Sequence, residues 1–105
     1  MSSDLTVLEE QREYELVFVL VGNLDDDSVR AFNERLGQVI ESQTGAINTT
    51  EIWGRRTLAY PIGKNFDGIY VLQRLQMLPS GTEELDRFLR FNENVIRYLL
   101  IRTDE

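Results

Sequence analysis

The fold is decided by the stretch Tyr14-Glu15-Leu16-Val17-Phe18-Val19-Leu20-Val21, an apolar run of strand length that is rich in β-branched residues. Its apolar residues fall at both odd and even positions, so that both faces of the strand would be shielded from water. This pattern predicts a central strand of a sheet. Gly22 and Asn23 follow directly and are expected to end the strand.

A helix is predicted after this strand. Residues Asp25 to Ser28 supply N-cap oxygens and negative charge for a helix N-terminus, and apolar residues then recur at helical spacing until Gly45, where the helix should stop. The three acidic residues 25–27 also raise the idea of a cation site, but carboxylates at the start of a helix are explained more simply as caps. The apolar stripe consists of Val29, Phe32, Leu36, Val39 and Ile40.

A β-hairpin is predicted next. The region from Ala46 to Ile62 is strand-like, and Gly54 within it indicates a bulge or bend. Because Pro61 cannot donate a hydrogen bond to a neighbouring strand, this strand should lie at an edge of the sheet. We expect a turn over residues 63–68 and a return strand over residues 69–77.

A second helix and a last strand complete the chain. Ser80 and Glu83 have the spacing of a capping box, and a short apolar stripe follows at Leu85, Phe88 and Leu89. The last strand is predicted over residues 95–102.

The order β-α-β-β-α-β is that of the split βαβ, or ferredoxin-like, arrangement, which is an α+β fold. Such a fold has a four-stranded antiparallel sheet in the order 4-1-3-2, with both helices on one face and the other face open. The 105 residues suffice for one domain. We assign this domain to residues 12–105 and a polar, flexible tail to residues 1–11.

The chain has a net charge of −7, yet residues 52–66 contain Arg55, Arg56 and Lys64 and no acidic residue. Residues 1–51 carry a net charge of −8, and residues 67–105 a net charge of −2. One positive segment in an acidic chain is the pattern expected of a localised contact with an anion or a nucleic acid. The alternative is that Arg55 and Arg56 are ordinary charged residues of a solvated edge strand.

The chain contains neither cysteine nor histidine. These absences exclude a disulfide framework and remove the commonest metal ligand and general base. We therefore predict no catalytic residues, no metal and no cofactor, and a protein that is not an enzyme. The first ten residues have no basic residue and no apolar run, and no segment approaches the ~18 apolar residues of a membrane span, which predicts an intracellular protein.

Two other families on this fold fit less well. RNA-recognition motifs stack bases on aromatic residues after a basic residue and a glycine, whereas this chain has an acid before the glycine in Asp67-Gly68 and only Tyr70 as an aromatic residue in the run from Asp67 to Leu72. We therefore expect contacts with phosphate and sugar rather than sequence-specific base stacking. Acylphosphatases hold an anion in a backbone loop, but the loop after the first strand here leads into acidic residues that would repel phosphate.

Four blocks within residues 13–104 resemble the bacterial small-subunit ribosomal protein six family. They are Tyr14 to Leu20, Trp53-Gly54-Arg55-Arg56-Thr57-Leu58-Ala59-Tyr60-Pro61-Ile62, Gly68 to Leu72, and Arg90-Phe91-Asn92-Glu93-Asn94-Val95-Ile96-Arg97. The resemblance implies the ferredoxin-like fold and a structural, non-enzymatic role in the cytoplasmic ribosome. It also implies binding to small-subunit ribosomal RNA together with small-subunit ribosomal protein eighteen, as a heterodimer. A non-ribosomal regulatory or protein-binding domain on the same fold is the alternative.

The predicted RNA-binding residues are Arg55, Arg56 and Lys64, with Arg12, Arg90 and Arg97 in addition. Replacing Arg55 and Arg56 by Ala is expected to lower the salt dependence of binding by about two units, one for each phosphate contact. The predicted partner surface consists of Trp53, Tyr60, Pro61 and Phe66, because aromatic residues are enriched at interfaces. The alternative for Trp53 and Tyr60 is that they complete the core.

Overall fold

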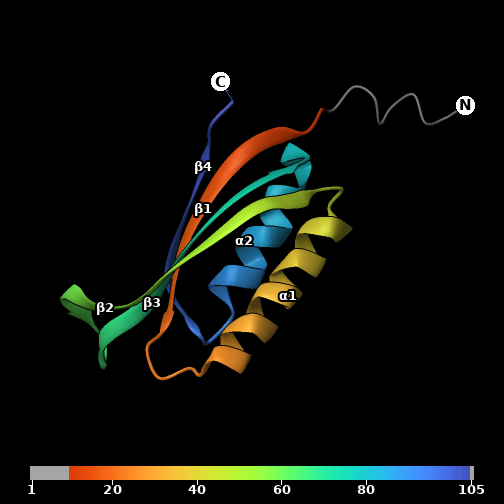
Figure 1. Ribbon diagram of the computed structural model, residues 1–105. Coiled ribbons are helices and arrows are strands. Elements are labelled where there is room, and N and C mark those ends of the chain that lie inside the picture. The colour runs from red at the N-terminus through yellow and green to blue at the C-terminus, as the bar shows by residue number, and fades with distance from the viewer. Residues whose placement is uncertain (1–9, 105) are drawn as a thin grey trace, which may run out of the picture.

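The computed structural model describes residues 10–104, and its elements follow the predicted β-α-β-β-α-β order (Figure 1). The tail expected over residues 1–11 lies outside the described residues except for Glu10 and Gln11. Gln11 Nε2 donates a hydrogen bond to the carbonyl of Thr44 at 2.6 Å. The elements are β1 (Arg12–Val21), α1 (Asp26–Ser42), β2 (Ala46–Ile62), β3 (Asn65–Met77), α2 (Thr82–Arg90) and β4 (Val95–Arg102).

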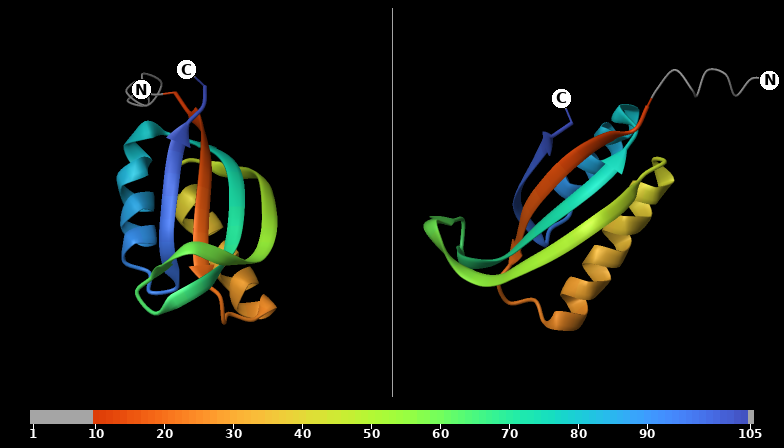
Figure 2. Two further views of the ribbon diagram at one scale, coloured as in Figure 1. Left: turned by 90° about the vertical axis from the view of Figure 1, so that its left-hand side faces the viewer. Right: turned by 45° about the horizontal axis from the view of Figure 1, so that its top comes forward.

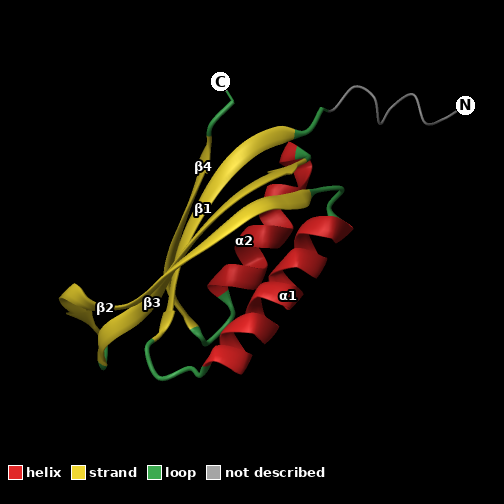
Figure 3. Cartoon of the chain, viewed as in Figure 1, coloured by secondary structure: helices red, strands yellow, loops and turns green. Residues whose placement is uncertain are grey.

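The four strands form one sheet in the order β2-β3-β1-β4. This is the predicted 4-1-3-2 order read from the other edge, and every pair of neighbours is antiparallel. Both helices cover the same face of the sheet (Figure 3). The strand that contains Pro61 lies at an edge, as predicted from the missing N–H of proline.

The core lies between the helices and one face of β1. Leu16, Phe18 and Leu20 are fully buried there, against the apolar stripe of α1. On the opposite face of β1, Val17 is half-buried and Val19 is buried. Both helices lie on the other side of the sheet, so that no helix covers this second face.

Asp25 caps the N-terminus of α1, as predicted. The backbone N–H of Ser28 donates to Asp25 Oδ1 at 2.8 Å. Hydrogen bonding from the Ser28 side chain, followed by that from its backbone N–H, holds the pKa of the Asp25 carboxyl below its ordinary value. The helix ends at Ser42, three residues before the predicted stop at Gly45. Thr44 then turns the chain with a positive φ of 60°, so that the turn lies before the glycine.

Acidification is expected to remove the stabilisation that the Asp25 cap provides. Because the folded-state pKa is lowered, that stabilisation is complete above the unfolded-state pKa and is lost as the pH falls through the folded-state pKa. At neutral pH, Asp25→Ala should lower the melting temperature by a few degrees, and the difference from wild type should shrink as the pH falls through the folded-state pKa of Asp25. Asp25→Asn is the control, because an amide caps without titrating. A difference that persists unchanged at low pH would contradict this assignment.

The hairpin between β2 and β3 differs from the prediction in the length of its turn. The turn is only Gly63-Lys64, and β3 begins at Asn65 rather than at residue 69. The expected turn over residues 63–68 was therefore too long, because Asn65 and Asp67 pair with β2. The bulge predicted at Gly54 is confirmed by a register shift there and by a φ of +93°.

Residues 57–67 project beyond the rest of the sheet, and we call them the arm. The last pair between β1 and β3 joins Val21 to Gly68, so that within the arm β2 and β3 pair only with each other. Thr57 pairs with Asp67 and Ile62 pairs with Asn65, so that residues 58–61 of β2 lie opposite the single residue Phe66. Pro61, which cannot donate to a ladder, falls in this irregular segment. Figure 2 (left) shows the arm crossing the ends of β1 and β4 on the open side of the sheet.

The second helix begins later than predicted. The expected capping box of Ser80 and Glu83 is wrong, because residues Pro79–Gly81 form one turn of 3₁₀ helix and Gly81 stands at the N-cap without a side-chain bond. Proline fixes its own φ and favours such a tight first turn. The buried stripe of Leu85 and Leu89 and the bounds of β4 are as predicted. No helix among residues 10–104 is long and apolar enough to cross a membrane.

Candidate nucleic-acid interface

The predicted basic residues gather mainly at one end of the molecule. Arg55 and Arg56 lie on β2 at the base of the arm, and Lys64 lies in the turn at its tip. Arg97 is the third residue of β4, opposite Val19, near the same end of the sheet. Arg12 lies at the other end, where it pairs with Met77.

Arg56 faces the open side of the sheet together with Trp53. Its guanidinium lies 5.9 Å from the centroid of the Trp53 ring, and Arg56 Nη2 donates to the Trp53 carbonyl at 3.4 Å. No carboxylate among residues 10–104 is close enough to pair with Arg56. The guanidinium is therefore exposed and keeps most of its hydrogen-bond donors for an anion.

A network of hydrogen bonds holds Trp53 in place beside Arg56. Trp53 Nε1 donates to Glu51 at 3.2 Å, and Arg74 bridges Glu51 and Glu15 across β2, β3 and β1 at 3.0 and 3.2 Å. The bond from Trp53, followed by that from Arg74, lowers the pKa of the Glu51 carboxyl. Sequence reasoning missed this network, because its members become neighbours only through the register of three strands.

Arg55 points to the opposite side of β2 from Arg56. Its Nε and Nη2 donate to the backbone carbonyls of Gly22 and Leu24, the second at 2.9 Å, in the loop between β1 and α1. The two adjacent arginines therefore occupy different surfaces, as the alternation of side chains along a strand requires. Of these two arginines, only Arg56 presents its guanidinium on the open side of the sheet.

The arm tip forms one wall of a polar cleft. The cleft has a volume of about 720 Å³ and lies between Lys64 and Phe66 of the arm and Asn23 and Asn94 of the body. Lys64 is exposed, and no carboxylate among residues 10–104 forms an ion pair with it. Its ammonium group is therefore available to an anion.

The three remaining basic residues differ in their surroundings. Arg90 ends α2, pairs with Asp86 at 2.7 Å and lies 5.5 Å from the centroid of the Phe91 ring. Arg12 lies 3.8 Å from Glu10. Arg97 is exposed on the open face, in a depression that it shares with neighbouring strand residues. Arg12 and Arg90 already have carboxylate partners, so that either would have to exchange one to bind phosphate.

The aromatic residues predicted for a partner lie on the surface. Tyr60 is 82% exposed, Phe66 68% and Trp53 44%, and Pro61 is exposed as well. The alternative that Tyr60 completes the core is therefore wrong. Tyr60, Pro61 and Phe66 belong to the arm, which has little apolar body to pack against.

Two further exposed apolar residues were missed by sequence reasoning. Leu99 and Ile101 of β4 are 57% and 46% exposed on the open face, in register with Val17 and Glu15 of β1. The apolar residues of β4 occur at both alternating positions, which hides the exposed side in the sequence. Among residues 10–104, no group of three or more acidic residues is arranged to hold a metal ion.

Comparison with known proteins identifies the family. The family model described as Ribosomal protein S6 matches residues 13–102. The small ribosomal subunit proteins bS6 of Caldanaerobacter subterraneus and Mycobacterium leprae are 39% and 43% identical over 90% of this chain, covering 99% and 98% of their own lengths. The crystal structure of 30S ribosomal protein S6 from Thermotoga maritima superimposes with a TM-score of 0.82 at 28% identity, covering 90% of this chain and 89% of that one. The chain belongs to the ribosomal protein S6 family of the small ribosomal subunit.

Proposed function

We propose that this chain is a structural constituent of the small subunit of the cytoplasmic ribosome, without catalytic activity, and that it binds ribosomal RNA cooperatively with ribosomal protein eighteen. The observation that carries the proposal is the arm together with the residues at its base, which present basic and aromatic side chains away from an otherwise acidic body. Arg56 at the base of the arm and Lys64 at its tip are exposed without carboxylate partners among residues 10–104. Such an element delivers positive charge to the phosphate backbone.

The acidic body makes a basic partner necessary in this proposal. A net charge of −7 repels RNA wherever the arm is not facing the backbone. A basic protein seated on the arm and the adjoining sheet surface would cancel this repulsion and join its own positive charges to those of the arm. Tyr60, Pro61 and Phe66, with Trp53 beside them, are the proposed contacts.

Sedimentation of a cell extract tests the assignment to the ribosome. At low salt the protein should migrate with small ribosomal subunits. Its absence from that fraction would favour the alternative of a regulatory or protein-binding domain on the same fold.

Arg56→Ala and Lys64→Ala are each expected to lower the salt dependence of RNA binding. In the presence of the partner, each variant should reduce the slope of log affinity against log salt by about one unit, because each removes one phosphate contact. The melting temperature should not change, since both side chains are exposed. Arg30→Ala is a matched control, because Arg30 lies on α1 and pairs with Asp27. Unchanged slopes for both Arg56→Ala and Lys64→Ala would identify these residues as ordinary solvated charges.

A further inference from the structure

We propose that Arg55 is a positioning residue, which holds the arm in the orientation that RNA binding needs and makes no phosphate contact of its own. This inference rests on the proposed function, since the arm matters only if it binds. It separates Arg55 from Arg56, its neighbour in sequence, to which a phosphate contact is assigned above.

The contacts of Arg55 join the base of the arm to the loop after β1. One guanidinium donates to two carbonyls of that loop, those of Gly22 and Leu24. Both carbonyls belong to backbone between β1 and α1, so that neither is used in a strand or helix ladder. A single side chain thus satisfies two acceptors and ties together segments more than thirty residues apart in sequence.

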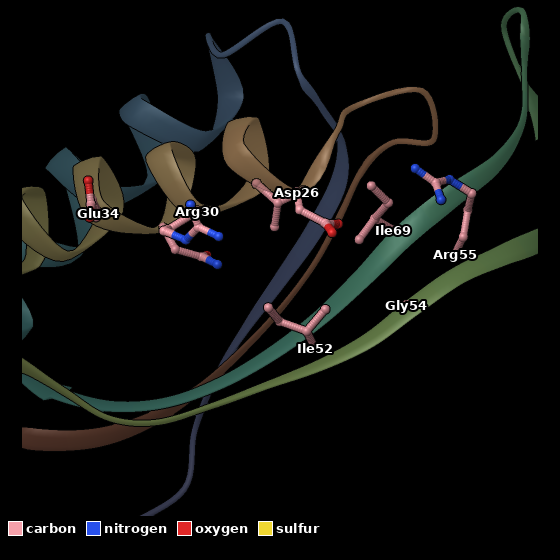
Figure 4. Close-up of a pocket in the computed structure, with 9 residues that line it drawn as sticks. Asp26, Arg30, Glu34, Ile52, Gly54, Arg55 and Ile69 are labelled. Atoms are coloured by element: carbon pink, nitrogen blue, oxygen red, sulfur yellow. The ribbon is translucent and has the colours of Figure 1, made fainter.

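The surroundings of Arg55 leave its guanidinium directed at this loop. Figure 4 shows the side chain at one end of a groove of about 490 Å³ between α1 and the hairpin, which is also lined by Ile52 and Ile69. Asp26 lines the same groove. Asp26 and Glu34 outnumber Arg30, the other basic residue that lines this groove, so that net negative charge opposes a phosphate that approaches Arg55 from this side.

The second strand of the hairpin approaches the same loop. A Cβ atom built on Gly22 would lie only 2.2 Å from Asp67 Oδ1, which shows that the side chain of Asp67 lies directly against this loop. Gly22 therefore lies against the hairpin through Asp67 and is bound to it through Arg55.

The arm needs such an anchor because it is a two-stranded ribbon. Isolated two-stranded ribbons are marginally stable in water, and the register shift between Thr57 and Ile62 removes part of the ladder. Leu58 is the arm's only buried apolar side chain among residues 57–67. Without Arg55, the arm would depend on Leu58 and on continuity with the sheet, and Arg56 and Lys64 would be placed less accurately.

The experiment compares Arg55→Ala, Arg55→Lys, Arg56→Ala and Arg56→Lys in two measurements. The first is affinity for small-subunit ribosomal RNA with the partner present, at several salt concentrations. The second is backbone ¹⁵N relaxation and amide exchange of residues 57–67 in the isolated protein. Arg56→Lys is the matched control, because it keeps the charge of a phosphate ligand.

Both Arg55 variants should lower affinity by about tenfold while leaving the salt slope unchanged, and both should increase motion and exchange in the arm. Arg55→Lys should not restore the affinity or the order of the arm, because one ammonium group cannot reproduce the forked guanidinium that reaches two carbonyls. Arg56→Ala should lower the slope of log affinity against log salt by about one unit while the arm stays as ordered as in wild type, and Arg56→Lys should keep the wild-type slope.

Two outcomes would overturn the proposal. If Arg55→Ala lowers the slope by about one unit and Arg55→Lys restores it, Arg55 is a phosphate ligand. If the arm stays as ordered as in wild type in both Arg55 variants, Arg55 does not hold it. Failure of the proposed function has a different signature: wild-type protein with its partner would not bind the RNA, whereas the relaxation measurement would still report on the anchor.

Discussion

The isolated chain is expected to bind small-subunit ribosomal RNA at least about a hundredfold more weakly than its complex with ribosomal protein eighteen at physiological salt. Binding by the chain alone relies on a few positive charges, chiefly Arg56 at the base of the arm and Lys64 at its tip, because Arg12 and Arg90 already pair with carboxylates. The net charge of −7 opposes the approach of RNA at every other surface. A hundredfold difference corresponds to about 2.7 kcal/mol, which two or three additional phosphate contacts from a basic partner can supply.

This expectation is checked by titrating the RNA with the chain alone, with the partner alone and with both. The affinity measured with both proteins should exceed that of either one, and the complex should show a steeper salt dependence than the isolated chain because it makes more phosphate contacts. Tight binding by the isolated chain at physiological salt, unimproved by the partner, would disprove cooperative binding while leaving the family unchanged.

Truncation of the arm's exposed aromatic residues should weaken the heterodimer strongly. Tyr60→Ala and Phe66→Ala are each expected to cost about 2 kcal/mol of binding, or roughly thirtyfold in the dissociation constant, as for aromatic residues at the centre of an interface. Neither variant should lower the melting temperature by more than a few degrees, since Tyr60 is 82% and Phe66 68% exposed. Isothermal titration of each variant with the partner measures the effect.

Phe91→Ala is the matched control for these variants. Phe91 is 76% exposed, as large as Phe66, and follows α2 in the helical layer rather than the arm. Its truncation should leave the heterodimer unchanged. If Leu99→Ala on the open face weakens the heterodimer and the arm variants do not, the partner binds the open face of the sheet instead.

Much of the fold could be predicted from local patterns. The run at residues 14–21, with apolar residues at both alternating positions, was sufficient to predict a central strand, and Pro61 was sufficient to predict an edge strand. Errors occurred where several local signals compete. The capping-box pattern at Ser80 was outweighed by the 3₁₀ turn that Pro79 begins. The polar residues Asn65 and Asp67 looked like turn residues although both pair with β2.

The candidate site was only partly accessible from sequence. The positive segment was visible as charge, and alternation already indicated that Arg55 and Arg56 point to opposite sides of β2. No local pattern indicated that the loop between β1 and α1 lies under Arg55, because that contact depends on how the hairpin crosses the end of β1. For the same reason, the pairing of Arg74 with Glu51 and Glu15 could not be foreseen.

The sequence by itself determined the order of the elements, the central place of β1, the edge position of β2 and the family, because each follows from residues adjacent in the chain or repeating at a fixed period. Only the tertiary structure decided which charges are available to a ligand. Arg55 donates to two backbone carbonyls, and Arg90 pairs with Asp86. Arg56 pairs with no carboxylate among residues 10–104. Electrostatic and hydrogen-bonding partners are set by distance in space, and a distance of a few ångströms here joins residues more than thirty positions apart in the chain.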